Sequence, residues 1–179
     1  MQHLDPADLV FVDESGSHQA MARDYARAPQ GQRAQGTKPL NRGRHVTMVG
    51  ALGVLGVVAA MMLEGFMDGA ACLVFVPEVL AAQLRPGQVV VLDNLKAQKV
   101  AGVQQAIAAV GAGVLYLPPY SPEFSPIEEG WSKVKTVLRT KAARTVEQLG
   151  QAIAEAFAAI TSQDARGGLA HAGYSVGSK

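Results

Sequence analysis

The pattern of apolar and polar positions predicts strands in the first half of the chain. The first apolar run, Leu9 to Asp13, is β-branched and ends in acids and glycine, which is typical of a buried strand. Residues 18–28 are ambiguous between strand and helix, whereas residues 29–44 are rich in Gly, Pro and basic side chains and predict a loop. We therefore expect a strand that is followed by a long basic connection.

Residues 46–63 form an uncharged stretch of eighteen residues, which is long enough to suggest a transmembrane helix. Glycines interrupt this stretch at positions 50, 53 and 56, and β-branched residues lie on either side of them. Such a pattern favours two buried strands, 46–52 and 57–63, joined by a glycine-rich turn. We therefore expect a strand pair and no association with a membrane.

The second half of the chain alternates helical and strand patterns. Residues 68–84 are rich in Ala and Leu and predict a helix that Pro77 starts or interrupts. Residues 88–93 are the clearest strand, an almost continuous apolar run of the kind that is covered on both faces of a sheet. A helix over 97–110 and a strand over 114–117 follow, and this order of strand, helix and strand predicts a parallel crossover.

A proline-rich loop over 118–126 leads to a helix that begins at Pro126, and an Ala-rich helix follows over 146–160. From Arg166 onward we expect little regular structure. The order of elements predicts an α/β fold with a mixed five-stranded sheet, in which three antiparallel strands precede parallel crossovers and helices flank the sheet. With 179 residues, 49% of them hydrophobic and 17% charged, the chain fits a single packed domain over 1–179.

Basic residues are concentrated in two runs, although the formal net charge of the chain is only +1. The first run comprises Arg23, Arg27, Arg33, Lys38, Arg42 and Arg44, and the second comprises Lys133, Lys135, Arg139, Lys141 and Arg144. Each run fits a solvated surface when it is taken alone. Beside a site that acts on nucleic acid, the same side chains would contact the phosphate backbone.

The chain contains one cysteine, Cys72, and so cannot form an internal disulfide. Its N-terminus lacks the basic and apolar regions of a secretory signal. Both observations predict a cytoplasmic protein.

Three acids lie at special points of the predicted elements. Asp13 ends the first strand, Asp93 ends the strand over 88–93, and Glu128 lies in the first turn of a helix. Ligands of open α/β sheets bind at the carboxyl ends of strands, which favours a chemical role for Asp93 and for Asp13 if its strand is adjacent. Both aspartates also fit ordinary strand-end turns. Glu128 equally fits a capping box with Ser125 as N-cap and Pro126 as first helical residue.

The helical wheel separates Glu128 from the neighbouring Glu129. The apolar stripe of this helix comprises Ile127, Trp131, Val134 and Leu138. Glu128 lies at the edge of the stripe, whereas Glu129 points to the opposite side, towards solvent. Lys135 and Arg139 share the flank of Glu128, where they would meet a phosphate backbone if Glu128 faces a site. Trp131 fits either a core residue or a side chain that stacks on a base.

Three carboxylates without a matching set of His or Cys favour a hard cation, Mg²⁺ or Mn²⁺, over zinc. His18, His45 and His171 lack the spacing of metal ligands, and no glycine-rich phosphate-binding loop is present. Two ions held about 3.5–4 Å apart can activate a nucleophile and stabilise the leaving oxygen of a phosphodiester. The acids and the basic runs together predict metal-dependent phosphodiester chemistry on a nucleic acid.

Three blocks of the sequence resemble the catalytic blocks of the DDE transposases of the mariner superfamily, in particular its bacterial insertion-sequence branch. They are VFVDESG at residues 10–16, VVVLDN at residues 89–94, and LPPYSPEFSPIEEGWSKVK at residues 117–135. The 34 residues between Asp93 and Glu128 match the usual distance between the second and third acids of that family. The resemblance extends over residues 9–174.

The resemblance implies a ribonuclease H-like fold in which Asp13, Asp93 and Glu128 bind two Mg²⁺ or Mn²⁺ ions. It implies hydrolysis at transposon ends to free a 3′-hydroxyl, then attack by that hydroxyl on target DNA, typically at a TA dinucleotide. DNA is the implied partner, with a homodimer on paired ends. We expect DNA contacts from Arg23, Arg27, Arg33, Arg42, Arg44, Lys135 and Arg139.

Two features depart from the family pattern. Gln98 stands where relatives often carry a His, and Asn94 has at most an indirect role at the metal site. Members usually begin with helix-turn-helix domains, which the few residues before the first strand cannot form, so we expect an isolated catalytic domain or a truncated copy. The alternatives are another ribonuclease H-like nuclease and a catalytically inactive remnant that binds DNA.

Overall fold

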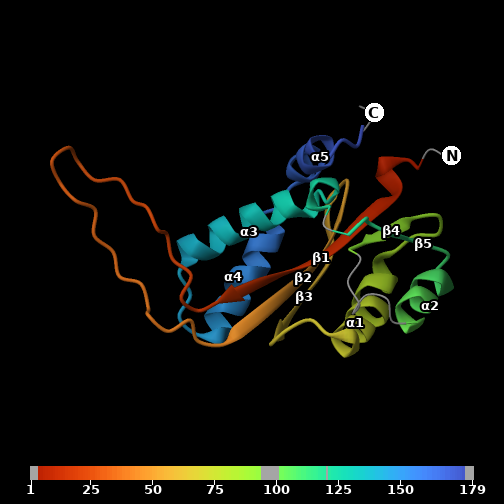
Figure 1. The fold of residues 1–179 in the computed structure, drawn as a ribbon, viewed down its shortest axis with the longest axis horizontal. Coiled ribbons are helices and arrows are strands. Elements are labelled where there is room, and N and C mark those ends of the chain that lie inside the picture. Colours follow the sequence, from red (N-terminus) through yellow and green to blue (C-terminus); the bar gives the residue numbers. More distant parts are fainter. Residues whose placement is uncertain (1–3, 94–100, 120, 176–179) are drawn as a thin grey trace.

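The computed structural model describes residues 4–93, 101–119 and 121–175. Its centre is a five-stranded sheet in the order β3-β2-β1-β4-β5 (Figure 1). The strands are β1 Leu9–His18, β2 His45–Gly53, β3 Gly56–Glu64, β4 Val89–Leu92 and β5 Gly113–Tyr116. The first three strands pair antiparallel, whereas β4 pairs parallel with both β1 and β5. The predicted mixed sheet is therefore confirmed.

The uncharged stretch 46–63 forms the adjacent strands β2 and β3, as predicted. Gly56 has a φ of 124° in the turn between them, a backbone conformation that favours glycine. Within the described ranges, no helix is long and apolar enough to cross a membrane.

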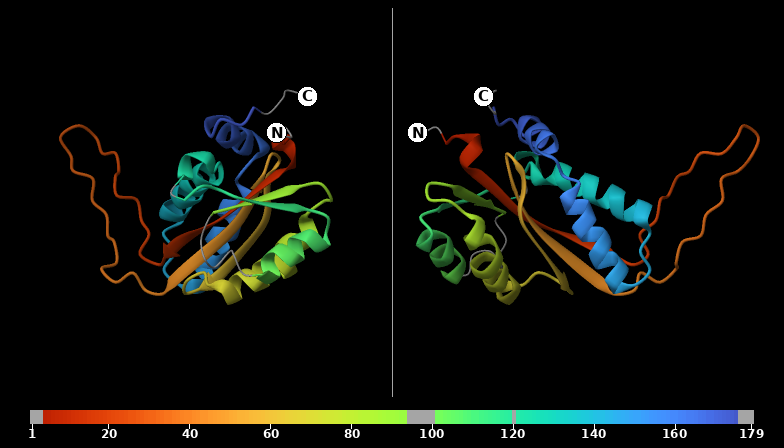
Figure 2. Two further views of the ribbon diagram at one scale, coloured as in Figure 1. Left: turned by 45° about the vertical axis from the view of Figure 1, so that its right-hand side comes forward. Right: turned by 180° about the vertical axis from the view of Figure 1, so that it is seen from behind.

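Helices cover both faces of the sheet (Figure 2). They are α1 Gly69–Val74, α2 Ala101–Ala109, α3 Ile127–Lys141, α4 Val146–Ala158 and α5 Ser162–His171. After α1 the chain continues through a π-helical segment, Phe75–Leu80, and a 3₁₀ turn, Ala81–Gln83. Pro77 lies inside the π-helical segment, where its missing N–H interrupts the regular α-helical pattern as predicted.

Two hydrophobic cores form, one on each face. The first core packs β1 and β2 against α3, α4 and α5, and the second packs the sheet against α1, the π-helical segment and α2. Phe11 belongs to the first core and Val12 to the second, because neighbouring side chains of a strand point to opposite faces. This burial on both faces explains the almost continuous apolar runs of β1 and β4.

The first strand is longer than predicted, so Asp13 lies within β1 and not at its end. The parallel pairing with β4 covers only Leu9 to Val12, but the antiparallel pairing with β2 continues as far as His18. Polar residues continue the strand because β2 supplies their backbone partners, and the buried Ser17 hydroxyl also donates to the Val46 carbonyl. Asp13 is thus the first residue beyond the parallel pairing.

Residues 19–44, which we name the basic arm, connect β1 to β2 without helix or strand and project far from the sheet (Figures 1 and 2). Every residue from Arg23 to Arg44 is exposed. The base of the arm is tied to the body, because the Arg144 guanidinium donates to the carbonyls of Gln19 and Met21 at 2.9 and 3.1 Å. The predicted basic loop over residues 29–44 is confirmed. The residues from Gln19 to Ala28, for which the sequence left strand and helix open, form neither.

The expectation of little regular structure after Arg166 is wrong. Helix α5 begins with a capping box, in which the Thr161 hydroxyl accepts from the Asp164 amide and the Asp164 carboxylate accepts from the Thr161 amide. Beyond the helix, the ring of Tyr174 packs edge-on against Phe11 at 5.1 Å between ring centroids. The end of the described chain is therefore anchored to the first core.

Candidate active site

The parallel pairing of β1 and β4 brings Asp13 and Asp93 side by side. Val12 lies opposite Leu92 in this pairing, and Asp13 and Asp93 are the next residues along the two strands. Because Val12 and Leu92 both face the second core, the alternation of side chains places Asp13 on the face of the first core. The ends of two neighbouring parallel segments thus present a pair of carboxylates.

Burial has the largest effect on the Asp13 carboxyl and raises its pKa from 3.8 to about 6. The Trp131 indole N–H, which donates to Asp13 Oδ2 at 2.9 Å, and the backbone of Glu14 stabilise the charged form and lower this pKa. The negative charges of Glu128 and Asp93 raise it. Asp13 therefore interacts electrostatically with both of the other candidate acids.

Glu128 reaches the site from the first turn of α3. The capping box, which the sequence leaves open as the alternative role of Glu128, is not formed, because Pro126 is the N-cap and the helix start has no side-chain capping hydrogen bond. Ser125 instead closes the preceding 3₁₀ turn, Pro122–Phe124, and its carbonyl accepts from the Glu128 amide at 3.2 Å. Glu128 is exposed and makes no side-chain capping hydrogen bond at this helix start.

The chemistry of these donors fits a hard divalent cation. Carboxylate oxygens are the ligands that Mg²⁺ and Mn²⁺ prefer. The like charges of Asp93 and Glu128 oppose ionisation of Asp13, and a bound cation would offset that repulsion. In the part of the chain that the structure describes, no three His, Cys, Asp or Glu side chains are grouped as closely as a formed metal site.

Residues 8–150 match the protein family described as DDE superfamily endonuclease. This chain belongs to that family. A search of curated protein sequences finds no match to this chain.

Solved structures of the Mos1 mariner transposase share the fold of this chain. A pre-cleavage Mos1 transpososome matches with a TM-score of 0.74 and 18% identity, over 92% of this chain and 52% of that chain. The Mos1 paired-end complex with Mn matches with a TM-score of 0.74 and 20% identity, over the same shares of both chains. The Mos1 catalytic domain matches with a TM-score of 0.61 and 16% identity, over 92% of this chain and 76% of that chain. This chain thus spans about half the length of the chains in the transpososome and the paired-end complex.

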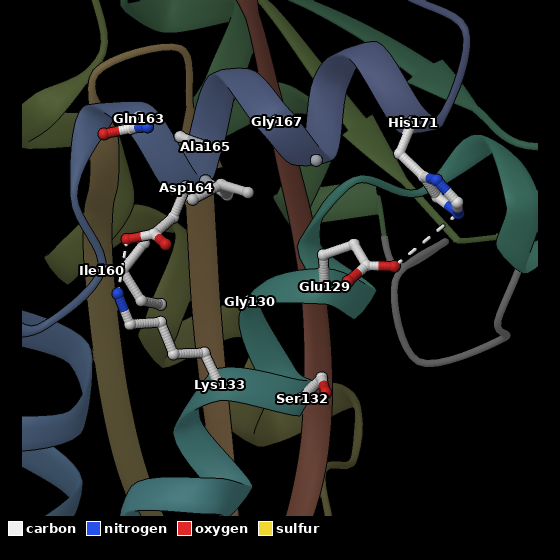
Figure 3. A pocket seen from close by; sticks show the side chains of 12 residues that line it. Glu129, Gly130, Ser132, Lys133, Ile160, Gln163, Asp164, Ala165, Gly167 and His171 are labelled. Atoms are coloured by element: carbon white, nitrogen blue, oxygen red, sulfur yellow. Dashed lines mark hydrogen bonds and ion pairs between the residues drawn. The ribbon is translucent and has the colours of Figure 1, made fainter.

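Glu129 is exposed to solvent, as the helical wheel predicts. It lines a groove of about 740 Å³ between α3 and α5, where its carboxylate lies 3.7 Å from His171 Nε2 (Figure 3). On the same groove, Lys133 Nζ forms an ion pair with Asp164 at 2.6 Å (Figure 3). These pairs join α5 to α3.

The predicted DNA-binding residues fall into two groups. On the basic arm, Arg27, Arg33 and Arg42 are exposed and make no hydrogen bond or ion pair within the described residues. In the second group, Arg23 donates to Thr140 at 2.9 Å and Arg44 forms an ion pair with Glu64 at 2.8 Å. The other two members lie on α3, where Lys135 is half-buried and Arg139 is exposed. The three arginines of the arm, together with Arg139 on α3, are therefore the ones whose charges are open to a partner.

Trp131 is the functional residue whose contact the sequence did not predict. Its burial in the first core confirms the core alternative, but its N–H also reaches Asp13. The sequence contains part of the information for this contact, because a buried indole N–H needs an acceptor and Trp131 lies three residues after Glu128. Asn94 and Gln98 lie outside the described residues.

Proposed function

We propose that this endonuclease is the catalytic domain of a mariner-type DNA transposase, which hydrolyses phosphodiesters at transposon ends and transfers the freed strand into target DNA. The observation that carries the proposal is the electrostatic grouping of Asp13, Asp93 and Glu128 at the end of the parallel pairing. The fold shared with the Mos1 catalytic domain supports it. The sequence blocks around the three acids favour the bacterial insertion-sequence branch.

Asp13, Asp93 and Glu128 would hold two Mg²⁺ or Mn²⁺ ions. When bound, such ions activate an attacking oxygen and neutralise the charge that develops on the leaving oxygen. Asp13 lies within β1 and Asp93 directly follows β4, whereas Glu128 would approach the ions from the first turn of α3. The three side chains would therefore act together as ligands of the ions.

DNA is the proposed partner, and a homodimer on paired ends is its proposed functional form. The Mos1 structures that match this fold include a paired-end complex and a strand transfer complex. We place the activity in the cytoplasm, where a bacterial transposase meets its DNA.

Joining of DNA ends is the test of this function. The chain is incubated with duplexes that carry candidate terminal repeats and a supercoiled target, with Mn²⁺ or with a chelator. We expect nicked and joined products with Mn²⁺ and neither product with the chelator. Cleavage of RNA–DNA hybrids or branched DNA without joining would favour another ribonuclease H-like nuclease. Salt-sensitive DNA binding without any cleavage would favour an inactive remnant.

The basic arm provides a separate prediction about DNA binding. Replacing Arg27, Arg33 and Arg42 together by Ala should weaken binding to any duplex, because each Arg–phosphate contact releases condensed counterions. The slope of log K against log salt should become shallower by roughly 0.9 per contact, or about 2 to 3 in total. Fluorescence anisotropy of a labelled duplex between about 50 and 200 mM salt measures both quantities.

The matched control replaces three neutral residues of the same arm, Gln30, Gln32 and Gln35, by Ala. These side chains are also exposed, so the control changes the arm without changing its charge. We expect the control to keep the wild-type slope. An unchanged slope in the arginine variant would show that the arm does not contact the phosphate backbone.

A further inference from the structure

Trp131 joins the first core to the candidate active site. Its side chain is only 2% exposed, and Ile127, Val134 and Leu138 on the same helix face are buried with it. Its indole N–H nevertheless points out of this apolar cluster and donates to Asp13 Oδ2 at 2.9 Å. One oxygen of the carboxylate is thus occupied by a donor that is itself fixed by packing.

The sheet leaves a space for this indole. Gly50 lies directly opposite Asp13 in the pairing of β1 with β2. A Cβ atom at Gly50 would lie 3.1 Å from Trp131 Cη2 and 3.3 Å from Phe157 Cε1, tighter than most Cβ contacts. Phe157 also packs edge-on against the indole, with 5.7 Å between ring centroids. The missing side chain at Gly50 therefore leaves the space in which the indole lies beside Asp13.

We propose that Trp131 is a positioning residue for the metal site, and that its indole N–H holds the Asp13 carboxylate in the orientation that binds the cation. The inference rests on the proposed function, because it needs Asp13 to be a metal ligand. A carboxylate with one oxygen held by a fixed donor cannot rotate freely, so its other oxygen is presented in one direction. Partners of this kind, which hydrogen-bond to a metal ligand, commonly change metal affinity by about 10–100-fold.

A purely structural role makes a different prediction about the ring at this position. If Trp131 only fills the core, Phe should replace it with a change in stability alone, because an aromatic ring is kept. If the N–H orients Asp13, Phe should weaken metal binding even where the fold is intact. The two roles therefore differ in whether Trp131→Phe weakens metal binding in addition to any change in stability.

The experiment compares the full chain with Trp131→Phe and with Phe157→Leu. Phe157→Leu loosens the packing around the same indole but keeps its N–H, so it is the matched control. Mn²⁺ binding is measured by the electron paramagnetic resonance signal of the free ion, and stability by thermal unfolding. We expect Trp131→Phe to bind Mn²⁺ about 10–100-fold more weakly. Phe157→Leu should melt at a lower temperature and bind Mn²⁺ within about twofold of the wild type.

A spectroscopic readout tests the contact directly. Trp131 is the only tryptophan of the chain, so an amide correlation spectrum contains a single indole N–H signal. We expect Mg²⁺ to move this signal in the wild type with the concentration dependence of ion binding, and not in Asp13→Asn, where an oxygen still accepts the hydrogen bond.

The outcomes distinguish this inference from the proposed function. Wild-type Mn²⁺ affinity in a folded Trp131→Phe chain, with an indole signal that ignores Mg²⁺ in the wild type, would overturn the positioning role and leave the metal site standing. If Trp131→Phe does not fold, the indole signal of the wild type decides alone. Absence of any Asp13-dependent Mn²⁺ binding in the wild type would overturn both.

Discussion

Glu128→Gln is expected to lower metal-dependent cleavage of DNA by roughly a thousandfold or more, while Glu129→Gln stays close to the wild type. A metal site supplies several kcal/mol of charge stabilisation in the transition state, and each 1.4 kcal/mol is about a factor of ten in rate. The negative charge of Glu128 raises the pKa of Asp13, whereas the carboxylate of Glu129 lies beside His171 in the groove between α3 and α5. Adjacent glutamates on one helix turn should thus differ by orders of magnitude.

Asp93→Asn should lose the same activity, because an amide keeps the size of the side chain but removes its charge. The measurement is single-turnover nicking of end-bearing duplexes with Mn²⁺, with circular dichroism to show that each variant is folded. Glu129→Gln is the matched control for Glu128→Gln, since it removes one charge from the same turn. Equal rates for Asp93→Asn and the wild type would refute the assignment of the site, and so would equal losses for the two glutamate variants.

The sequence was most informative where one short segment determines the structure. Residues 88–93 predict a buried strand that ends at an acid, and β4 covers Val89–Leu92 with Asp93 following. The apolar stripe Ile127, Trp131, Val134 and Leu138 also depends only on helical periodicity, and the buried face of α3 confirms it, whereas the choice of Glu128 over Glu129 stays a prediction. Such predictions succeed because apolar periodicity is a local property of the chain.

Long-range pairing accounts for what the sequence could not provide. The polar residues after Asp13 indicated the end of a strand, but β2 continues the pairing to His18. The contact between Trp131 and Asp13 joins residues 118 positions apart and depends on the small size of Gly50. The spacing alone allowed a capping box at Ser125. In the structure, Ser125 instead ends the preceding 3₁₀ turn, and its backbone N–H donates to the Pro122 carbonyl.

Helix α5 escaped prediction because its own sequence is a poor helix former. Gly167 and Gly168 lie in its interior and lower the intrinsic helix propensity by roughly 1 kcal/mol each relative to Ala. The helix is stabilised instead by its capping box, by burial of Leu169 and by the ion pair of Asp164 with Lys133. Of these contributions, only the burial and the ion pair depend on the tertiary structure, and neither is visible in a local pattern.

Replacing the two adjacent glycines of α5 by Ala is expected to change the free energy of unfolding in opposite directions. A Cβ atom at Gly168 would lie 2.8 Å from the carbonyl oxygen of Pro126, a backbone atom that can move only with the start of α3. Such overpacking costs roughly 1–3 kcal/mol, of which the better helix propensity of Ala recovers about 0.5–1 kcal/mol. Gly168→Ala should therefore lower the free energy of unfolding by about 1–2 kcal/mol, or the melting temperature by roughly 2–8 °C.

Gly167→Ala is the matched control, because a Cβ atom at this exposed position meets no atom within 4 Å. It gains the helix propensity without the clash and should raise the unfolding free energy by about 0.5–1 kcal/mol. Thermal and urea unfolding of both variants measure the difference. Because Pro126 precedes Glu128 by two residues, Gly168→Ala should also slow DNA cleavage, whereas Gly167→Ala should not. Equal stabilisation by both substitutions would mean that α5 does not approach the start of α3 as closely as 2.8 Å requires.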